Sequence, residues 1–590
     1  MMHIFTFHVL RFTRSDFCIP ISLEVLLSIF TIVFYRLRWQ LLVTVAGLLI
    51  VAGLLANLAR NQTTGVVPDE SGTYTEGLAG RVHVVNPLLW GTSAEHDLVS
   101  LVFSGLTRTD EHGQIVADVA EGWTVIDDGL TYIFTLREDA SWHDGSLVTA
   151  DDVIYTIGLL QDDGSDLLPD QASLWRTVTV DKLDRRTIRF SLSEPLAPFL
   201  YYTSLPLLPA QRLRNVTAQA LPQVSFNQSP VGSGPFRLVE LDREHVKLEA
   251  FDDFYGTQPY LKEIVFRLYP DVQSLLTAYQ AGEIQGVSRL LTQDFETASN
   301  LDDLAIYSAQ QTSCVALILN LDEPALKDRR VRRALLMAID RQQLIDDYLA
   351  GQAVVADSPI FPGSWAYNPE IRRVRNDAEA ARVLLKQAGW VDADGDGVRD
   401  RGGQRFEVEV LTNDDPTRRA MAETIARQWT EIGVRTSVQT LNVAALRAQH
   451  LEPRQFDAVL YGWTQTMADP DPYSLWHSSQ IQGGQNYAGL EHRAIDNLLE
   501  AGRRTTDVEA RRQLYREFQQ LFADEVPALL LYYPVYHYGV DVRVQNIQLP
   551  RTMFQPSDRF QTLYRWYVRP EQQITQAEPL PLLQLWNRRD

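Results

Sequence analysis

The sequence predicts an α/β protein with more than one domain. Its 590 residues exceed what one hydrophobic core supports, and 45% hydrophobic with 22% charged residues are the proportions of an ordinary globular protein. From residue 81 to about 310, short β-rich segments alternate with a few helices, whereas from 311 to about 527 strands and helices alternate regularly. That regular alternation favours an α/β lobe with a parallel or mixed sheet.

The stretch Leu101–Leu160 contains a clear succession of elements. Trp123–Ile126 has the composition of a short strand, Asp127–Gly129 is a turn typical of a tight hairpin, and Tyr132–Leu136 alternates as the returning strand. Thr149–Asp152 then supplies an N-cap threonine followed by acids, which predicts that a helix begins there. The stretch is therefore predicted to form strand, turn, strand, loop and helix.

The later part of the chain is predicted to alternate helices and strands. Its predicted helices are Arg329–Leu349, Asp377–Ala388, Thr417–Ile432 and Ala494–Glu500. Its predicted strands are Val408–Leu411, Val434–Gln439, Ala458–Tyr461 and Ala528–Tyr533, and the last of these leads back to the first domain. This order is what predicts the second, α/β lobe.

The N-terminal region 1–64 is predicted to be a membrane anchor. Leu41–Leu58 is an apolar run long enough to span a bilayer, and Arg36 and Arg38 precede it. Because positive residues stay on the inner side, the rest of the chain is expected outside the cell membrane. The apolar stretch 19–35 is a second candidate span.

An uncleaved anchor is favoured over a cleaved signal, which is the alternative. The apolar run is followed neither by a suitable small-x-small cleavage site nor by a cysteine that could accept a lipid. A segment rich in Thr, Gly, Ser and acids at 65–80 is expected to be a linker between membrane and domain.

Composition excludes several classes of function. The net charge of −21 and the lack of a basic patch with aromatic residues argue against nucleic-acid binding. Cys18 precedes the predicted span and Cys314 follows it, so neither an internal disulfide nor a thiolate metal site is expected. No nucleophile elbow, Walker loop or zinc-protease motif occurs. These absences argue against an enzyme, so neither catalytic residues nor a required cofactor is expected.

Several motifs follow one another along most of the chain after residue 64. They include Val119–Trp123, the Asp127–Gly129 turn, Trp142–Gly145, Pro230–Phe236 and Ala278–Glu283. Each motif alone is weak, but in this order they resemble the bacterial extracellular solute-binding proteins of the oligopeptide, dipeptide and nickel family. Members of that family are the receptors of ABC importers.

The resemblance implies a two-lobed, periplasmic-binding-protein-like fold. The implied parts are a first lobe at 81–310 with an extra β-rich subdomain at 108–226, a second lobe at 311–527, a return to the first lobe at 528–569, and a tail at 570–590. Crossings near 310–314 and 526–532 are expected to form a hinge that closes on a ligand. The implied function is to capture a peptide or similar solute between the lobes and deliver it to an ABC permease. A membrane-anchored sensory or adhesive ectodomain on the same fold is the alternative.

The segment from Tyr461 to Tyr473 is the best candidate for a loop that contacts the solute. It follows a buried-looking strand, and loops at strand ends of an α/β lobe face the cleft, so Tyr461, Trp463 and Asp469 are predicted ligand residues. Peptide-binding relatives carry an acid three positions after the matching tryptophan, where it pairs with the α-amino group of the ligand. Here that position is Thr466, so a neutral or blocked solute, or a longer peptide, is expected before a free dipeptide. Stacking on aromatic rings keeps an oligosaccharide as another candidate ligand.

Four of the candidate ligand residues also have a structural interpretation, which for Trp463 is packing in the core. Trp365 lies in a loop that, by the resemblance, reaches the cleft, although packing in the core explains it equally well. Asn486 is predicted to contact the ligand or to cap a turn, and the cap is favoured. Asp469 precedes a proline, which is also typical of a turn.

The segment 392–400 resembles a calcium-binding loop. Asp392, Asp394, Asp396 and Asp400 occupy positions one, three, five and nine, and a glycine stands at position six. Position twelve is a glycine, so the bidentate glutamate that completes such sites is missing. The alternative is an ordinary acidic turn. If calcium binds, its role is expected to be structural and remote from the cleft.

Overall fold

The computed structural model describes residues 72–465 and 468–569 and, near the N-terminus, residues 27–28, 31–32, 35, 38, 42–49 and 51–52; of Asp170 it describes the backbone alone. The chain divides into two compact units, Met1–Val67 and Pro68–Asp590. The predicted tail at 570–590 and the candidate ligand residue Thr466 lie outside the described residues.

The N-terminal unit contains helical residues at 42–49 and 51–52. Of the helices that the structure describes, none combines the length and the apolar character that crossing a membrane requires. The predicted spans 41–58 and 19–35 both extend beyond the described residues. The N-terminal transmembrane segment therefore stays a prediction from the sequence.

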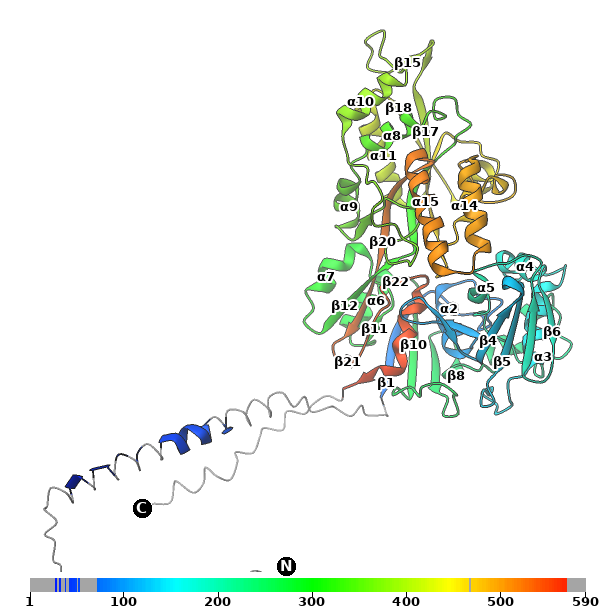
Figure 1. The fold of residues 1–590 in the computed structure, drawn as a ribbon, viewed down its shortest axis with the longest axis vertical. Coiled ribbons are helices and arrows are strands. Elements are labelled where there is room, and N and C mark those ends of the chain that lie inside the picture. The colour runs from blue at the N-terminus through cyan, green and yellow to red at the C-terminus, as the bar shows by residue number, and fades with distance from the viewer. Residues whose placement is uncertain are drawn as a thin grey trace, which may run out of the picture. The chain divides into compact units, whose positions relative to one another are not determined.

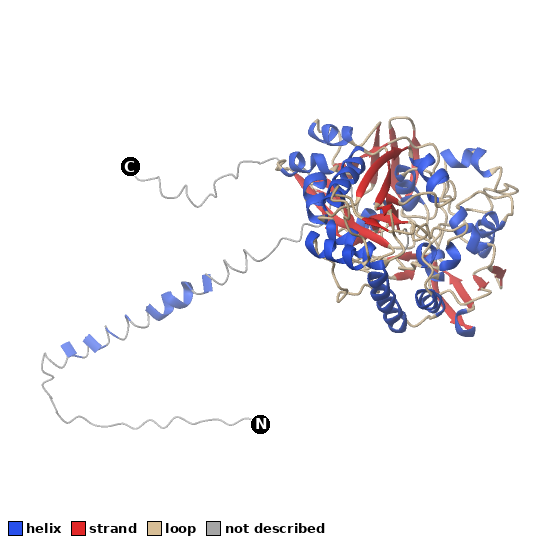
Figure 2. Ribbon diagram, turned by 90° about the horizontal axis from the view of Figure 1, so that it is seen from above, coloured by secondary structure: helices blue, strands red, loops and turns tan. Residues whose placement is uncertain are grey.

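The larger unit is a mixed α/β structure in which helices pack around a long central sheet (Figure 1, Figure 2). The strands of the central sheet are β1 (Thr73–Ala79), β8 (Phe236–Leu241), β9 (His245–Ala250), β10 (Glu263–Tyr269), β11 (Gly286–Val287), β12 (Leu304–Gln311), β13 (Ser313–Leu319), β14 (Ala353–Val355), β17 (Glu407–Asn413), β18 (Arg435–Leu441), β19 (Ala458–Thr464), β20 (Ala528–Asp541) and β22 (Thr552–Met553). A separate sheet consists of β4 (Ala120–Ile126), β5 (Thr131–Leu136), β6 (Thr179–Lys182) and β7 (Thr187–Ser191). Short pairs are β2 (Thr107–Thr109) with β3 (Ile115–Ala117), β15 (Asp400–Arg401) with β16 (Gln404–Arg405), and β21 (Val544–Gln545) with β23 (Tyr567–Val568).

The helices of this unit lie on both sides of the sheets. They are α2 (Ser93–Val102), α3 (Ala150–Gln161), α4 (Pro169–Trp175), α5 (Phe199–Tyr202), α6 (Gln273–Gln280), α7 (Phe295–Ser299), α8 (Arg329–Ala338), α9 (Arg341–Leu349), α10 (Ala378–Gln387), α11 (Pro416–Glu431), α12 (Val443–Ala445), α13 (Tyr473–Trp476), α14 (Arg493–Arg504) and α15 (Val508–Glu525). A longer 3-10 segment near the C-terminus, η7, covers Pro556–Arg565.

The central sheet has the strand order β18-β17-β19-β13-β20-β11-β1-β10-β9-β8, and β12 and β14 also pair with β20. We call the part built around β1 and β8–β12 the first lobe, and the part built around β13 and β17–β19 the second lobe. In the second lobe β17 runs parallel to β18 and β19, whereas β13 is antiparallel to β19 and β20. The predicted α/β lobe with a parallel or mixed sheet is therefore confirmed, and the sheet is mixed.

Two segments carry the chain between the lobes. β12 ends at Gln311 and β13 begins at Ser313, while β20 pairs with β13 up to Tyr532 and with β12 from Val535 (Figure 1). Thr312 is held at the first crossing, because its amide donates to the Met553 carbonyl (3.0 Å) and its hydroxyl donates to the carbonyl of Gln465 (2.5 Å). The second crossing lies slightly later than the 526–532 expected from the sequence.

The predicted linker 65–80 is wrong over residues 73–79, which form β1 inside the first-lobe sheet. β1 runs parallel to β10 along its whole length, and Tyr74, Glu76 and Leu78 are buried. The Thr-, Gly- and Glu-rich composition suggested a solvated linker. The charge of Glu76 is instead paired with Arg559, 483 residues further along the chain, which no local pattern reveals.

The hairpin β4–β5 forms as the sequence predicts. At its turn Asp127 and Asp128 have φ values of 54° and 53°, a left-handed conformation that aspartate tolerates better than most residues. The hydroxyl of Thr131 donates to Asp127 Oδ2 (2.9 Å) and closes the turn. The following helix α3 begins at the predicted cap, where Thr149 and Asp152 form a capping box.

The single helix predicted at Arg329–Leu349 is wrong, because the structure has two helices, α8 and α9, with a break at Ile339–Asp340. Asp340 caps the second helix by accepting a hydrogen bond from the Gln343 amide (3.0 Å). Ile339 is buried at the break. Apolar residues recur with helical spacing through both helices, so the sequence pattern does not show that one helix ends and another begins.

The second-lobe sheet is covered on both faces. Leu317 and Leu319 of β13 belong to one hydrophobic cluster, whereas Ala316 and Ile318, one residue out of step, belong to another. Successive side chains of a strand point to opposite faces, so a strand buried on both sides is apolar throughout. A third large cluster fills the first lobe.

Candidate ligand-binding cavity

A cavity of about 560 Å³ is lined by first-lobe residues and by Ala468 of the second lobe. Its walls come from α2 and the loop after it, the β2–β3 hairpin, the segments 201–206 and 254–259, and η7. The volume lies within the range of roughly 300–1,000 Å³ that is typical of small-molecule sites. The cavity also reaches the loop after β19, where the sequence predicts ligand contacts, so we take it as the candidate site.

Aromatic side chains form much of the cavity wall. Trp90, Tyr201, Tyr202, Tyr255 and Tyr564 line it, and they come from four segments of the first lobe. Aromatic faces bind apolar groups by contact and stacking, and tyrosine hydroxyls add a polar edge. The wall therefore suits a solute with both apolar and polar groups.

A fully buried arginine fixes two walls of the cavity to the first-lobe sheet. Arg559 of η7 pairs with Glu76 of β1 and with Asp97 of α2, each at 2.6 Å. The hydroxyls of Tyr74 and Tyr538 also donate to Glu76, at 2.8 and 2.6 Å. Burial raises the pKa of Asp97 to about 6, and the charge of Arg559 opposes that shift. This cluster holds α2 and η7 in position relative to β1.

Two titratable groups of the cavity have shifted pKa values. Burial, assisted by the positive charge of Arg559, lowers the pKa of His96 to about 4, so its ring is neutral at pH 7. Burial raises the pKa of Asp118 to about 6, and a hydrogen bond from the Tyr255 hydroxyl (2.6 Å) opposes the shift. At neutral pH the cavity thus presents a neutral histidine and a carboxylate that is mostly ionised.

Most of the predicted ligand residues lie in the second lobe, and those that the structure describes are not part of the cavity wall. The Tyr461 ring meets that of Tyr487 edge-on at 6.4 Å, and Trp463 meets Trp476 edge-on at 5.8 Å. Tyr461, Trp463 and Trp365 are partly buried against one hydrophobic cluster of the second lobe. Their contact with a solute stays a prediction.

The two aspartates after β19 are paired with arginines. Asp469 is 2% exposed, and its carboxylate accepts hydrogen bonds from Arg511 of α15 at 2.7 and 2.9 Å. Asp471 accepts a hydrogen bond from Arg503 of α14 at 2.7 Å, and the Arg503 guanidinium lies 3.8 Å from the ring centre of Tyr473. These charges hold the loop to α14 and α15, so neither carboxylate is a free anion that could replace the acid missing at position 466.

Asn486 is fully buried and all its side-chain groups are in use. Its Nδ2 donates to the carbonyls of His477 (3.1 Å) and Leu490 (3.0 Å), and its Oδ1 accepts from the Leu490 amide (3.0 Å). This is the turn-capping role that the sequence favoured over ligand contact.

The residues that do line the cavity were missed by sequence reasoning. Tyr201 and Tyr202 are consecutive in the sequence, as are Phe254 and Tyr255, and all four residues line the cavity. Two aromatic residues in succession, found in both segments, were the available signal. Their convergence depends on how the β-rich subdomain packs on the first-lobe sheet, which local patterns do not encode.

The predicted calcium residues are brought together in part. Carboxylate oxygens of Asp392, Asp394 and Asp396 lie within 4.8 Å of one another. Asp400 lies outside that group, and its Oδ2 accepts the Ala393 amide at 3.2 Å. Arg405 pairs with Asp396 and lies 4.0 Å from Asp394, so a side-chain cation already offsets part of the negative charge. Calcium binding stays a prediction.

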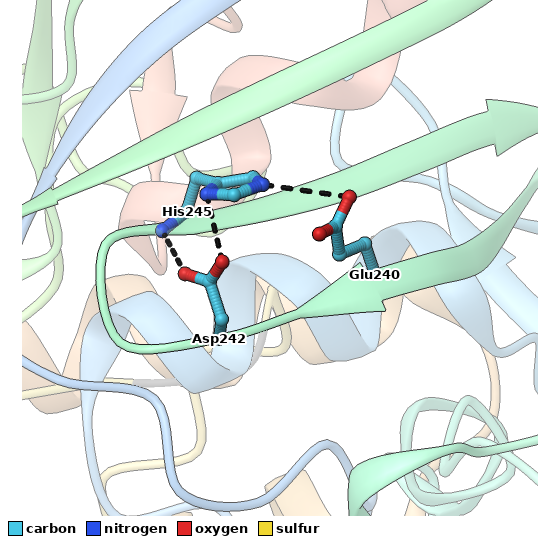
Figure 3. Close-up of side chains that lie close together, drawn as sticks. All are labelled: Glu240, Asp242 and His245. Atoms are coloured by element: carbon cyan, nitrogen blue, oxygen red, sulfur yellow. Dashed lines mark hydrogen bonds and ion pairs between the residues drawn. The ribbon is translucent and has the colours of Figure 1, made fainter.

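A second group with metal-ligand chemistry lies on the β8–β9 hairpin and was not found from the sequence. Figure 3 shows Glu240 and Asp242 on either side of the His245 ring, whose Nδ1 lies 3.0 Å from Asp242 and whose Nε2 lies 3.5 Å from Glu240. The Asp242 carboxylate also accepts the backbone amides of Glu244 and His245. Each ring nitrogen of His245 therefore faces a different carboxylate. Polar side chains around an exposed turn commonly have this arrangement without a metal ion.

The family model of bacterial extracellular solute-binding proteins, family 5 (middle region), matches residues 114–485. This chain belongs to that family. The stretch includes the sheet of β4–β7, parts of both lobes and the β19 loop.

Individual relatives agree with this assignment. The oligopeptide-binding protein AppA of Bacillus subtilis is 29% identical over 513 residues, which cover 85% of this chain and 92% of AppA. Protein XP55 of Streptomyces lividans is 31% identical over 462 residues, covering 76% of this chain and 81% of XP55.

Solved structures of two relatives share the fold. The structure of AppA in complex with a nonapeptide matches with a TM-score of 0.67 and 28% identity, over 85% of this chain and 100% of that one. NikZ of Campylobacter jejuni in complex with Ni(L-His) matches with a TM-score of 0.68 and 26% identity, with the same coverage. The predicted two-lobed, periplasmic-binding-protein-like fold is thereby confirmed, and the family-5 protein is an extracytoplasmic solute-binding protein.

Proposed function

We propose that this family-5 protein captures a peptide or a chemically similar solute in the first-lobe cavity and delivers it to an ABC permease. The observation that carries the proposal is the cavity of about 560 Å³, whose aromatic wall combines ring faces with hydroxyls and a carboxylate. Peptides present apolar side chains beside a polar backbone and match such a wall. The relatives are transport receptors, so the sensory or adhesive alternative is not favoured.

The names of the relatives support a peptide before other solutes. AppA is named an oligopeptide-binding protein and was solved with a nonapeptide, whereas NikZ was solved with Ni(L-His). In this chain the cavity wall holds His96 and Asp118, and burial keeps the histidine neutral. A nickel complex is therefore the second solute class to test.

Closure of the lobes is the physical basis of the proposed capture. Gln465, two residues after Trp463, exchanges two hydrogen bonds with Thr312: its amide donates to the Thr312 carbonyl (2.8 Å), and its carbonyl accepts the Thr312 hydroxyl. A solute that contacts the β19 loop would therefore also act on the crossing between the lobes. Such a receptor works by binding its solute more tightly in one conformation than in the other.

The solute is expected to be a blocked or longer peptide and not a free dipeptide. Asp469 and Asp471 are bound to Arg511 and Arg503, so neither supplies the missing partner for an α-amino group. An unpaired ammonium group buried by closure would be costly. N-terminally acetylated tetrapeptides should therefore bind more tightly than free dipeptides.

Calorimetry with the full chain tests this proposal. The panel consists of free dipeptides, acetylated tetrapeptides, longer peptides, oligosaccharides and the nickel–histidine complex. We expect binding of the acetylated or longer peptides. Micromolar binding of a free dipeptide that disappears when its amine is blocked would contradict the expected preference, and binding of only the sugar or the nickel complex would refute the peptide proposal.

A membrane anchor at 41–58 is part of the same proposal, because a tethered receptor stays near its permease. The apolar run and the preceding Arg36 and Arg38 support it. Membranes of cells that express the chain should retain it after alkaline washing. Release of the protein into the wash, or a mature N-terminus beyond residue 58, would refute the anchor.

A further inference from the structure

One arginine of the cavity differs from the other arginines near it. Arg137 forms two hydrogen bonds with Asp139, Arg565 pairs with Glu111, and Arg559 pairs with two carboxylates. Arg108 also lines the cavity and is exposed there. Within residues 72–465 and 468–569, it has neither an ion-pair partner nor a hydrogen-bond acceptor.

The backbone of Arg108 is held in place, although its guanidinium has no partner in the described part of the chain. It is the middle residue of β2, and its neighbour Thr107 is buried. The Thr107 hydroxyl donates to the Leu200 carbonyl (3.0 Å), and its amide donates to the Thr203 carbonyl (3.3 Å). A fixed backbone positions the side chain over the cavity without using its charge.

Asp118, which also lines the cavity, does not neutralise Arg108 by contact. Burial raises the pKa of Asp118, and the positive charge of Arg108 opposes that shift, so the two groups interact through space. Asp118 nevertheless accepts its hydrogen bond from Tyr255, and it forms no ion pair with Arg108. All five guanidinium donors of Arg108 are thus available to a planar anion, which arginine binds through two parallel hydrogen bonds.

A second polar atom of the same wall is also available. Gln561 of η7 lines the cavity, and its Oε1 is buried without a hydrogen-bond donor among the described residues. The other end of this amide hydrogen-bonds Asp558, which fixes the orientation of the group. The cavity therefore offers a free donor set on β2 and a free acceptor on η7. A peptide supplies the complements of both, a terminal carboxylate and backbone N–H groups.

We propose that Arg108 binds the terminal carboxylate of the solute and makes the cavity selective for peptides with a free C-terminus. This inference rests on the proposed peptide-binding function and adds an orientation, with the carboxylate end at the β2–β3 hairpin. The chain carries a net charge of −21, so an anionic group needs a local positive charge of this kind to be held.

The test compares two acetylated tetrapeptide libraries of mixed sequence, one with free C-terminal carboxylates and one with C-terminal amides. The full chain is mixed with both at equal concentration, and bound peptides are counted by native mass spectrometry. We expect wild type to prefer the free acids by at least about tenfold, as a charge-assisted hydrogen bond predicts. Arg108→Gln should abolish the preference, and Arg108→Lys should retain part of it.

Arg243→Gln is the matched control. Arg243 is exposed in the β8–β9 turn, outside the cavity wall, and its substitution should leave the preference unchanged. An equal preference in wild type and Arg108→Gln, or no preference in wild type, would overturn the proposal for Arg108 while leaving peptide binding intact. Binding of neither library by wild type would refute the peptide function itself, and this inference with it.

Discussion

The two lobes use charged side chains in different ways near the cavity. In the second lobe, Asp469 is bound by Arg511 and Asp471 by Arg503, so the charges of the β19 loop are consumed in holding it to α14 and α15. In the first lobe, Arg108 lines the cavity and has no partner among the residues that the structure describes. A paired charge has little left to offer a ligand, whereas an unpaired one retains its full donor set. Under the proposal for Arg108, the first lobe binds the carboxylate of the solute and the second lobe holds its β19 loop in a fixed position.

The largest expected effect comes from the buried cluster behind the cavity. Arg559→Met would leave Glu76 and Asp97 buried without their cation, and we expect the free energy of unfolding to fall by about 5 kcal/mol, or soluble protein to be lost. Urea unfolding followed by fluorescence measures the change. Arg243→Met, at an exposed site, is the control. A loss below about 1 kcal/mol would show that the cluster does not frame the cavity.

Breaking the Asp469–Arg511 ion pair tests whether the second lobe holds the β19 loop in a fixed position. Asp469→Asn leaves Arg511 buried without a carboxylate, and the free energy of unfolding should fall by about 3 kcal/mol. The selectivity of the libraries for free C-terminal carboxylates should stay unchanged, because that lobe does not hold the anion. If Asp469→Asn removed the selectivity and kept the stability, the roles of the two lobes would be reversed.

The pH dependence of the free energy of unfolding tests the burial of Asp118 in the cavity wall of the first lobe. Burial raises the pKa of Asp118 from 3.8 to about 6, so protonated Asp118 stabilises the folded state below pH 3.8, and this contribution is lost as the pH rises through about 6. Asparagine does not ionise, so the Asp118→Asn variant does not lose this stability as the pH rises. The free energy of unfolding of the variant, relative to that of wild type, should therefore increase between pH 4 and pH 7. We expect a gain of about 1 kcal/mol, since Asp118 is partly exposed. A constant difference across this range in urea unfolding would contradict it.

The smallest expected effect concerns the acidic loop of the second lobe. If calcium binds Asp392, Asp394, Asp396 and Asp400, the missing twelfth ligand predicts a Kd of roughly 10⁻⁴–10⁻³ M. About 1 mM calcium should then stabilise the fold by about 0.4 to 1.4 kcal/mol relative to chelator. Melting curves measure this, with Asp394→Ala as the control. An unchanged wild-type melting temperature means an ordinary acidic turn in which Arg405 supplies the counter-charge.

Local elements were predicted well where the signal lies within a few residues. The β4–β5 hairpin follows from its Asp-Gly turn, and α3 follows from the Thr149 cap. Helices α10 and α11 and strands β17 and β18 lie where apolar spacing and turns put them. The break between α8 and α9 was missed, because one Asp340 cap does not interrupt the apolar spacing.

The candidate site was predicted poorly, because its residues meet only after folding. In the sequence Asp469 looked like a free acid in an Asp-Pro turn. In the structure its carboxylate is paired with Arg511, which lies 42 residues later in the chain. Glu76 looked solvated until Arg559 reached it across 483 residues. Ion pairing between distant residues decides which charges are free, and no local pattern records it.

The sequence by itself determined the family, the α/β class and most of the elements, because hydrophobic periodicity, caps and turns act over short distances. The order of the motifs also predicted a protein that binds a solute and catalyses no reaction. The tertiary structure alone decided where the cavity lies and which of its charges are available. Those properties depend on the long-range contacts that bury Arg559 and Asp469 while they leave Arg108 without a partner in the described part of the chain.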